Sequence, residues 1–267
     1  MRQFEVPFNH KNDLLQFYIK YKKGLQKHII HIYTAPFIED YCATRHLTAN
    51  KPSERSVYEL QIRQLQQAGY EVALTLNGND LINNDFIKYY VDNLNIKTYI
   101  CKHYKDALLL KQYNPSIKVI ASITKKLNFD DISKKDLSIY DYIVLYYNFN
   151  ASIDLIRKLP TRNKYILMTN TWCDYTCNFA HWYNETNFKC PLSINGYKNT
   201  TWIFAEDLKY FDPYINIYKL QGRDYETSII IKELLYFLYN KDIDDHFESF
   251  KLRCNYDSNY YNRYIQE

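Results

Sequence analysis

The sequence predicts a single eight-stranded α/β barrel. Apolar segments of strand length alternate with amphipathic segments of helical length through most of the 267 residues. Such alternation is typical of parallel βαβ units with right-handed crossovers. Eight units in a chain of this length match a closed (β/α)8, or TIM-like, barrel. An open doubly wound sheet is the alternative, but no glycine-rich phosphate turn follows the first expected strand.

The first half of the chain begins with an amphipathic helix over residues 13–23, with Gly24 placed to end it. A short apolar strand starts at His28, and a well-patterned helix covers 54–68, where Gly69 stops it. Strands starting at Glu71 and Lys97 then alternate with helices over 83–94 and 104–113.

The second half continues this alternation. Strands start at Ile117, Tyr142 and Lys164, with short helices over 133–137 and 152–159 between them. A strand from Thr200, a helix over 206–211, a strand from Ile215 and a long helix over 227–239 complete the pattern. We expect residues 1–239 to form the barrel and 240–267 to form a short C-terminal tail that packs on or beside it.

Composition and charge exclude several classes of protein. The 46% of hydrophobic residues can form a large core, and the net charge of +4 is spread along the chain. This distribution lacks the dense basic stripe of a dedicated nucleic-acid binder, so an RNA partner is possible but not favoured. The N-terminus has no apolar run of signal-peptide length, and residues 228–239 are too short for a membrane span. We expect a cytoplasmic protein, in which cysteines more often bind metals or react than form disulfides.

Three of the six cysteines are spaced Cys173-x3-Cys177-x12-Cys190, directly after an expected strand. If the segment after Trp172 is helical, Cys173, Cys177 and His181 share one face. Thiolates at this spacing are suited to a soft metal or an iron–sulfur cluster. The alternative is that the cysteines are small buried hydrophobic residues.

Active sites of such barrels lie at the carboxyl ends of the strands. The loops that hold Cys42, Asn77, the Cys173–Cys190 segment and Arg223 are all expected at that end. Lys219 and Arg223 flank the end of the last strand, where an arginine can bind a carboxylate or phosphate with two hydrogen bonds.

Other roles remain open for these residues. Lys219 and Arg223 could instead form a salt bridge to Glu206 or Asp224. Asn77 could be only a turn residue. Arg45, in the loop after the first expected strand, is placed similarly to Arg223 and could likewise bind an anionic group.

Several short motifs, in order, resemble the collagenase-like peptidases, family thirty-two of the unknown-mechanism class, and their relatives. They are Asn170-x2-Cys173-x3-Cys177-x3-His181 followed by Cys190; the segment Trp202-Ile-Phe-Ala-Glu-Asp-Leu208; the segment Tyr218-Lys-Leu-Gln-Gly-Arg223; and Gly69-x7-Asn77-Gly78. The resemblance covers roughly residues 33–239 and implies the same barrel. It departs at Phe204 and Ala205, where the family commonly has Arg-Pro, and the chain lacks the extra C-terminal domain of larger RNA-modifying members.

The resemblance also implies a cofactor and a reaction. Several relatives hold a 4Fe–4S cluster with four cysteines, and some act in oxygen-independent hydroxylation of RNA bases or of the ubiquinone precursor. By this resemblance, Cys173, Cys177 and Cys190 are metal ligands. Cys42, in the loop after the first expected strand, is the fourth, with Cys254 as the alternative. Tetrahedral zinc is the alternative metal, although structural zinc sites more often use two close cysteine pairs.

We therefore predict an iron–sulfur-dependent modifying enzyme that hydroxylates a small molecule, nucleobase or peptide. Its predicted catalytic residues are His181, Lys219 and Arg223, and its predicted substrate-binding residues are Arg45, Asn77 and Asn170. The alternatives are a non-catalytic, cluster-bearing subunit that pairs with an unlike barrel of the same family, and a peptidase. Peptidase activity is less favoured because no nucleophile–base pair or zinc-protease motif is visible.

Overall fold

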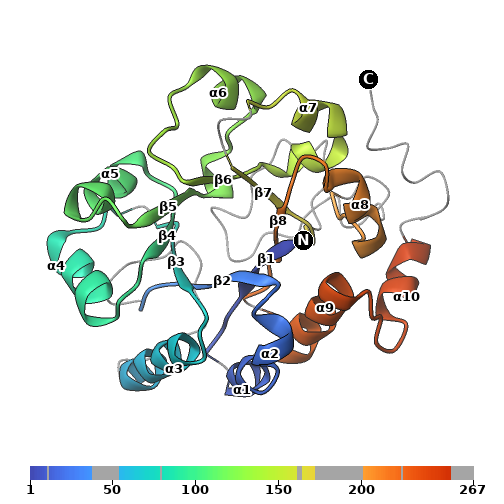
Figure 1. Cartoon of the computed structure of the whole chain (residues 1–267), viewed down its shortest axis with the longest axis horizontal. Coiled ribbons are helices and arrows are strands. Elements are labelled where there is room, and N and C mark those ends of the chain that lie inside the picture. Colours follow the sequence, from blue (N-terminus) through green and yellow to red (C-terminus); the bar gives the residue numbers. More distant parts are fainter. Residues whose placement is uncertain are drawn as a thin grey trace.

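The computed structural model describes residues 1–10, 12–37, 54–78, 80–160, 164–171, 201–223 and 225–253. Eight parallel strands close into one barrel in the order of the chain, and the helices surround it (Figure 1). The predicted single (β/α)8 barrel is confirmed. The strands are β1 (Gln3–Pro7), β2 (Ile29–Thr34), β3 (Val72–Leu76), β4 (Thr98–Cys101), β5 (Lys118–Ala121), β6 (Tyr142–Val144), β7 (Tyr165–Met168) and β8 (Ile217–Lys219).

The helices follow the strands as expected for βαβ units. They are α1 (Asn12–Lys20), α2 (Lys22–Leu25), α3 (Arg55–Gln67), α4 (Asn84–Ile87), α5 (Tyr104–Tyr113), α6 (Phe129–Lys134), α7 (Ile153–Arg157), α8 (Leu208–Phe211), α9 (Thr227–Tyr239) and α10 (His246–Arg253). A π-helical segment, Lys88–Asn93, extends α4. Gly69, which follows α3, has a φ of +88°, a backbone conformation that favours glycine.

The number of strands is as predicted, but the identity of one strand is not. The predicted strand from Thr200 is wrong, because residues 201–204 do not pair as a strand. The apolar residues Trp202, Ile203 and Phe204 are fully buried without forming a strand. They lie beside the end of β7, where the Ile203 amide donates to the Thr169 carbonyl. The missing strand is β1, which pairs with both β2 and β8 and so closes the barrel. The loop that begins after Phe37 therefore follows the second strand, not the first.

The pleat of the strands separates two cores. Side chains that point outward pack under the helices in the larger core, to which Phe4 and Val6 of β1 belong. Side chains that point inward form a smaller apolar cluster of Tyr33, Ala73, Ile100, Ile120, Ile123, Val144, Ile166, Met168 and Ile217. Because successive strand residues point to opposite faces, Glu5 lies on the inner side, between the outward-facing Phe4 and Val6.

The region predicted as a tail begins with a packed helix. Phe247 and Phe250 of α10 contact Trp202, and Phe247 also stacks on Tyr236 of α9 at a centroid distance of 4.0 Å. These ring contacts hold α10 against the outside of the barrel. Residues 254–267 lie outside the described residues.

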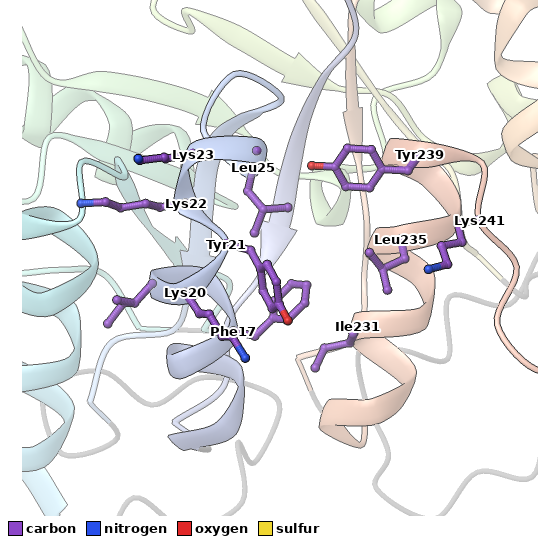
Figure 2. A pocket seen from close by; sticks show the side chains of 12 residues that line it. Phe17, Lys20, Tyr21, Lys22, Lys23, Leu25, Ile231, Leu235, Tyr239 and Lys241 are labelled. Atoms are coloured by element: carbon purple, nitrogen blue, oxygen red, sulfur yellow. The ribbon is translucent and has the colours of Figure 1, made fainter.

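A groove of about 710 Å³ lies on the outer wall, between α1–α2 on one side and α9 on the other (Figure 2). Helices of a βαβ barrel run opposite to their strands, so the C-terminal ends of α2 and α9 lie at the amino ends of the strands. The groove therefore extends away from the end where barrel active sites are found. None of the described helices is long and apolar enough to cross a membrane.

Candidate functional site

Four of the predicted site residues are in the described part of the chain, and all four lie at or just beyond the carboxyl end of a strand. Asn77 follows β3, Asn170 follows β7, Lys219 ends β8 and Arg223 follows it. The other predicted residues lie outside the described residues: Cys42, Arg45, Cys173, Cys177, His181 and Cys190, together with the alternative ligand Cys254. Within the described residues, no group of His, Cys, Asp and Glu side chains is arranged to hold a metal ion.

Lys219 forms an ion pair inside the barrel with Glu5 of β1. Its Nζ lies 2.6 Å from Glu5 Oε2, and the two side chains are 7% and 0% exposed. The pair forms because β1 and β8 are neighbours and Glu5 and Lys219 are in register. Of the two salt-bridge partners considered from the sequence, Asp224 lies outside the described residues, and Lys219 pairs with Glu5, from the other end of the chain, and not with Glu206. Glu206 instead binds Lys251 at 2.5 Å.

The surroundings of this pair act on both pKa values. Burial alone would raise the pKa of Glu5, but the charge of Lys219 and the hydrogen bond from His31 outweigh it and lower that pKa to about 2. Burial lowers the pKa of Lys219, while the Glu5 carboxylate opposes this change. Glu5 is therefore ionised at neutral pH, and its carboxylate favours the charged form of Lys219 inside a largely apolar barrel.

His31 of β2 connects this pair to a second one. Its Nδ1 lies 3.0 Å from Glu5 Oε1, and its Nε2 lies 3.7 Å from Glu71 Oε1. An ionised carboxylate only accepts hydrogen bonds, so the Nδ1 carries the proton in the bond to Glu5. The imidazole is fully buried, and the geometry fixes its orientation between the two carboxylates.

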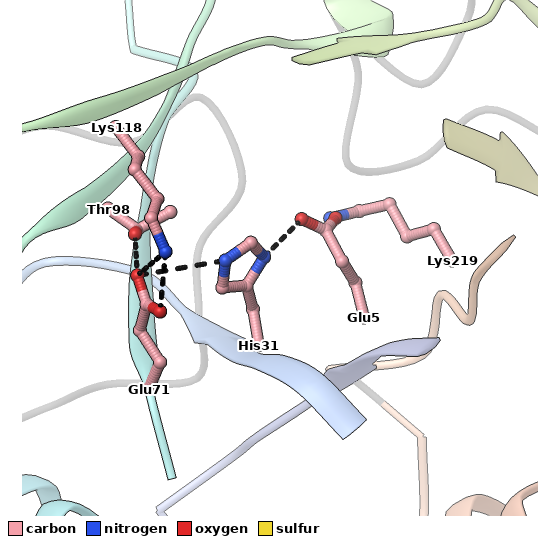
Figure 3. A network of polar contacts seen from close by, with 6 residues as sticks. All are labelled: Glu5, His31, Glu71, Thr98, Lys118 and Lys219. Atoms are coloured by element: carbon pink, nitrogen blue, oxygen red, sulfur yellow. Dashed lines mark hydrogen bonds and ion pairs between the residues drawn. The ribbon is translucent and has the colours of Figure 1, made fainter. Parts of the chain in front are cut away.

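The second pair lies at the amino ends of the strands. Lys118 Nζ is 2.9 Å from Glu71 Oε2, and the Thr98 hydroxyl donates to Glu71 Oε1. Both charged side chains of this pair are partly exposed. Figure 3 shows the six side chains as one series across the barrel interior, from Lys118 and Thr98 through Glu71 and His31 to Glu5 and Lys219. We call this series the interior network.

Tyr33 of β2 lies beside the interior network at the carboxyl ends of the strands. Lys219 Nζ is 3.6 Å from the centre of its ring, and the Arg223 guanidinium carbon is 5.6 Å from it. The Tyr33 hydroxyl donates to the Leu220 carbonyl at 2.6 Å and so anchors the ring to the end of β8. Two cationic side chains thus lie within about 6 Å of one aromatic ring, whose π electrons attract positive charge. The charge of Arg223 contributes to the lowered pKa of Lys219.

Asn170 joins the ends of β7 and β8 to α9. Its amide accepts from the Gln221 backbone amide at 2.6 Å and donates to the Gln221 carbonyl at 3.0 Å. It also donates to Glu233 Oε2 at 2.8 Å. Burial raises the pKa of Glu233 to about 8, with a smaller opposing effect from Asn170. These contacts fix the backbone two residues before Arg223, and the predicted role of Asn170 in substrate binding stays a prediction.

Asn77 has a similar local contact. The Thr124 hydroxyl donates to its Oδ1 at 3.2 Å, joining the end of β3 to the turn after β5. Its predicted role in substrate binding also stays a prediction. Cys101, at the end of β4, is fully buried, and burial raises the pKa of its thiol well above the usual range.

The sequence analysis missed the residues that join Lys219 in the interior network, and also Tyr33 beside it. The missed members of the network are Glu5, His31, Glu71, Thr98 and Lys118. One signal was present for two of them. Glu5 alternates with Phe4, Val6 and Phe8, and His31 interrupts an apolar run. A single charged or titratable residue at an inward position of an otherwise buried strand is rare, because burying it requires a partner.

Comparison with known proteins identifies the fold. No protein-family model and no curated protein matches the sequence. The solved structure of the U32 peptidase Mk0906 is similar over 85% of this chain and 95% of its own, with a TM-score of 0.53 and 10% identity. A xylanase and α-amylase inhibitor protein from Scadoxus multiflorus is similar over 91% of this chain and 100% of its own, with a TM-score of 0.50 and 11% identity. A peptidase and an enzyme inhibitor thus share this architecture, so function must be argued from the site. The chain has the barrel fold found in a U32 peptidase.

Proposed function

We propose that this chain is a barrel enzyme that carries a 4Fe–4S cluster at the carboxyl ends of its strands and catalyses an oxygen-independent modification. An example is hydroxylation in which an organic oxygen donor gives its OH group to the substrate and takes up the displaced hydrogen. Its substrate would be a small molecule or a peptide with an anionic group. Cys173, Cys177 and Cys190 would hold the cluster together with Cys42. The proposal extends the family resemblance of the motifs to the geometry around Lys219.

The observation that carries the proposal is the charged Lys219 inside the barrel, at the end where barrel active sites lie. The interior of such barrels is usually filled with branched apolar side chains. Removing an ammonium group from water costs several kcal/mol, and an ion pair offsets this only in part. Lys219 and Arg223 together would bind a carboxylate or phosphate group of the substrate.

The donor set suits the proposed cluster. Four thiolates are the usual ligands of a 4Fe–4S cluster, which supplies one-electron transfer when bound. The last described residues before the two cysteine-containing segments are Phe37 and Thr171, which follow the carboxyl ends of β2 and β7. Both residues therefore follow strand ends on the same side of the barrel, which supports the proposal. Side chains of the protein would bind the substrate and transfer the proton. Lys219 and Arg223 would orient the anionic group, and His181 would move a proton near neutral pH.

Iron analysis of anaerobically purified protein tests the cluster. The protein should be brown, with about four irons and four sulfides per chain. Cys173→Ala and Cys177→Ala should lose the colour while circular dichroism still reports a folded barrel. Cys101→Ala is the matched control, because this buried cysteine lies outside the motif, and it should retain the iron. Colourless protein, or zinc in place of iron, would contradict the cluster.

A second experiment separates an enzyme from a cluster-bearing partner subunit. Small molecules that co-purify anaerobically with the wild type would be identified by mass spectrometry and compared with those from Arg223→Ala. An enzyme should lose an anionic small molecule in the variant while keeping its iron and its fold. If the wild type and Arg223→Ala carry the same molecules, the site at the barrel end does not bind substrate, and the partner-subunit alternative is favoured.

A further inference from the structure

The groove between α1–α2 and α9 has an apolar floor formed by two facing rows of side chains. On α9, Ile231, Leu235 and Tyr239 recur every four residues, and Phe17 and Tyr21 do the same on the opposite side. Residues four apart lie on the same face of a helix. Figure 2 shows these two rows pointing toward each other across the groove. A channel between two such rows is shaped to receive one row of side chains from a third helix.

The groove has a defined end. Gly24 of α2 lies so close to α9 that a Cβ at this position would be 3.1 Å from the Tyr239 hydroxyl. The Tyr239 ring also packs edge-on against His28, with a centroid distance of 5.8 Å. The α9 row runs from Ile231 to Tyr239, eight residue steps, which is about 12 Å or two helical turns. The groove thus suits a short helix that presents apolar residues at positions i, i+3 or i+4, and i+7.

The charge around the groove has one sign. Lys20, Lys22, Lys23 and Lys241 line it, and none of its lining residues is acidic. These four lysines form no ion pair within the described part of the chain.

Two of the three acidic side chains between α9 and α10 make contacts away from the groove lining. Asp242 accepts backbone hydrogen bonds from Phe247 and Glu248, and Asp244 pairs with Lys232. A helix with carboxylates beside its apolar row would therefore meet four lysines and no acidic side chain in the groove lining.

We propose that this groove is a docking site for an acidic amphipathic helix of a partner protein. The helix would place its apolar row between the rows of α1 and α9, and its glutamates or aspartates beside the lysines. The site lies on the outer wall, toward the amino ends of the strands. A bound partner would leave the carboxyl ends of the strands accessible, so this inference is independent of the proposed function.

A pair of synthetic peptides of opposite charge tests the proposal. The first is about 15 residues long, long enough to form a helix on binding, with leucines at i, i+3, i+4 and i+7 and glutamates flanking them. The second has the same leucines with lysines in place of the glutamates. Fluorescence anisotropy of each labelled peptide, titrated with the full chain, gives the dissociation constant. We expect the acidic peptide to bind at least about tenfold more tightly, because each exposed ion pair contributes a factor of up to about five.

Variants locate the binding site. Lys22→Glu/Lys23→Glu should abolish the preference for the acidic peptide, and Leu235→Ala, which shortens the apolar row without changing its charge, should weaken binding of both peptides. The matched control is Lys88→Glu/Lys105→Glu, which reverses two exposed lysines on other helices and should leave binding unchanged. Because Lys22, Lys23, Lys88 and Lys105 are exposed, these variants are expected to fold.

Three kinds of result would overturn the proposal. The first is absence of saturable binding of the acidic peptide. The second is equal binding of the two peptides, or equal loss in the groove and control variants. The third is binding of anionic phosphatidylglycerol vesicles through the same lysines without binding of the acidic peptide, which would identify a lipid surface as the occupant.

Discussion

Replacing Glu5 with Gln should strongly destabilise the protein, although the two side chains have nearly the same shape. The change leaves the Lys219 ammonium buried, with a neutral amide where its carboxylate was. Removing one partner of a buried ion pair typically costs about 3–5 kcal/mol, because the remaining charge is desolvated and uncompensated. For a chain of this size, each kcal/mol lowers the midpoint of thermal unfolding by about 2–4 °C. We therefore expect Glu5→Gln to lower that midpoint by about 10 °C.

Urea unfolding at pH 7, followed by circular dichroism, measures this free energy. The matched control is Asp130→Asn, which breaks the exposed pair with Lys134, whose side chains are 71% and 75% exposed. Its stability should be close to that of the wild type. If Glu5→Gln is as stable as this control, the buried pair does not stabilise the barrel in the way described.

The same variant has a defined pH dependence. The folded pKa of Glu5 is about 2, below its ordinary value of 4.5. Its carboxylate therefore stabilises the protein above about pH 4.5 and loses this effect as the pH falls toward 2. The stability difference between the wild type and Glu5→Gln should be largest near pH 5 and shrink below pH 4. A constant difference over the whole range would refute the assigned charge state.

Two further predictions concern Glu233 and Gly69. Burial raises the pKa of Glu233 in the folded protein to about 8. The contribution of the protonated Glu233 side chain to the free energy of unfolding is therefore fully present below pH 4.5 and is lost as the pH rises through 8. Glu233→Gln should match the wild type at pH 5 and exceed it by up to about 4 kcal/mol at pH 9, measured by urea unfolding. Equal pH profiles would contradict this. Gly69→Ala should lower the free energy of unfolding by about 1–3 kcal/mol, because φ is +88° and the new Cβ would lie 2.5 Å from Gln26 Nε2; an unchanged urea midpoint would show that the turn relaxes.

The parts of the fold that the sequence predicts best are helices with a full apolar stripe and a clear end. The predicted ranges 104–113 and 227–239 coincide with α5 and α9. A barrel strand is shorter and carries two kinds of side chain, one facing the helices and one facing the interior. β1 was missed because Glu5 interrupts its apolar pattern, while residues 201–204 were taken for a strand because burial alone made them apolar.

The candidate site shows the same limit. Lys219 and Arg223 could be selected from the sequence because a strand ends there and their charge suits an anionic group. The partner of Lys219 could not be identified from the sequence, because Glu5 is 214 positions away. The two side chains meet only when β1 closes the barrel beside β8. His31 and Glu71 join the interior network through the register of β1, β2 and β3, which depends on the stagger of the closed barrel.

A double replacement would separate the structural from the functional role of Lys219. Replacing both partners of a buried ion pair with apolar residues of similar volume is often neutral or stabilising by about 1–4 kcal/mol, because no charge is left to desolvate. Glu5→Leu/Lys219→Met should therefore fold at least nearly as well as the wild type and much better than Glu5→Gln.

If Lys219 also binds an anionic substrate group, this stable double variant should no longer carry the anionic small molecule that the wild type retains under anaerobic conditions. Mass spectrometry of the co-purified molecules checks this expectation. A double variant that is stable and still retains the same molecule would show that the Glu5–Lys219 pair serves the barrel alone. The loss of binding in a protein that has become no less stable would assign Lys219 to the substrate.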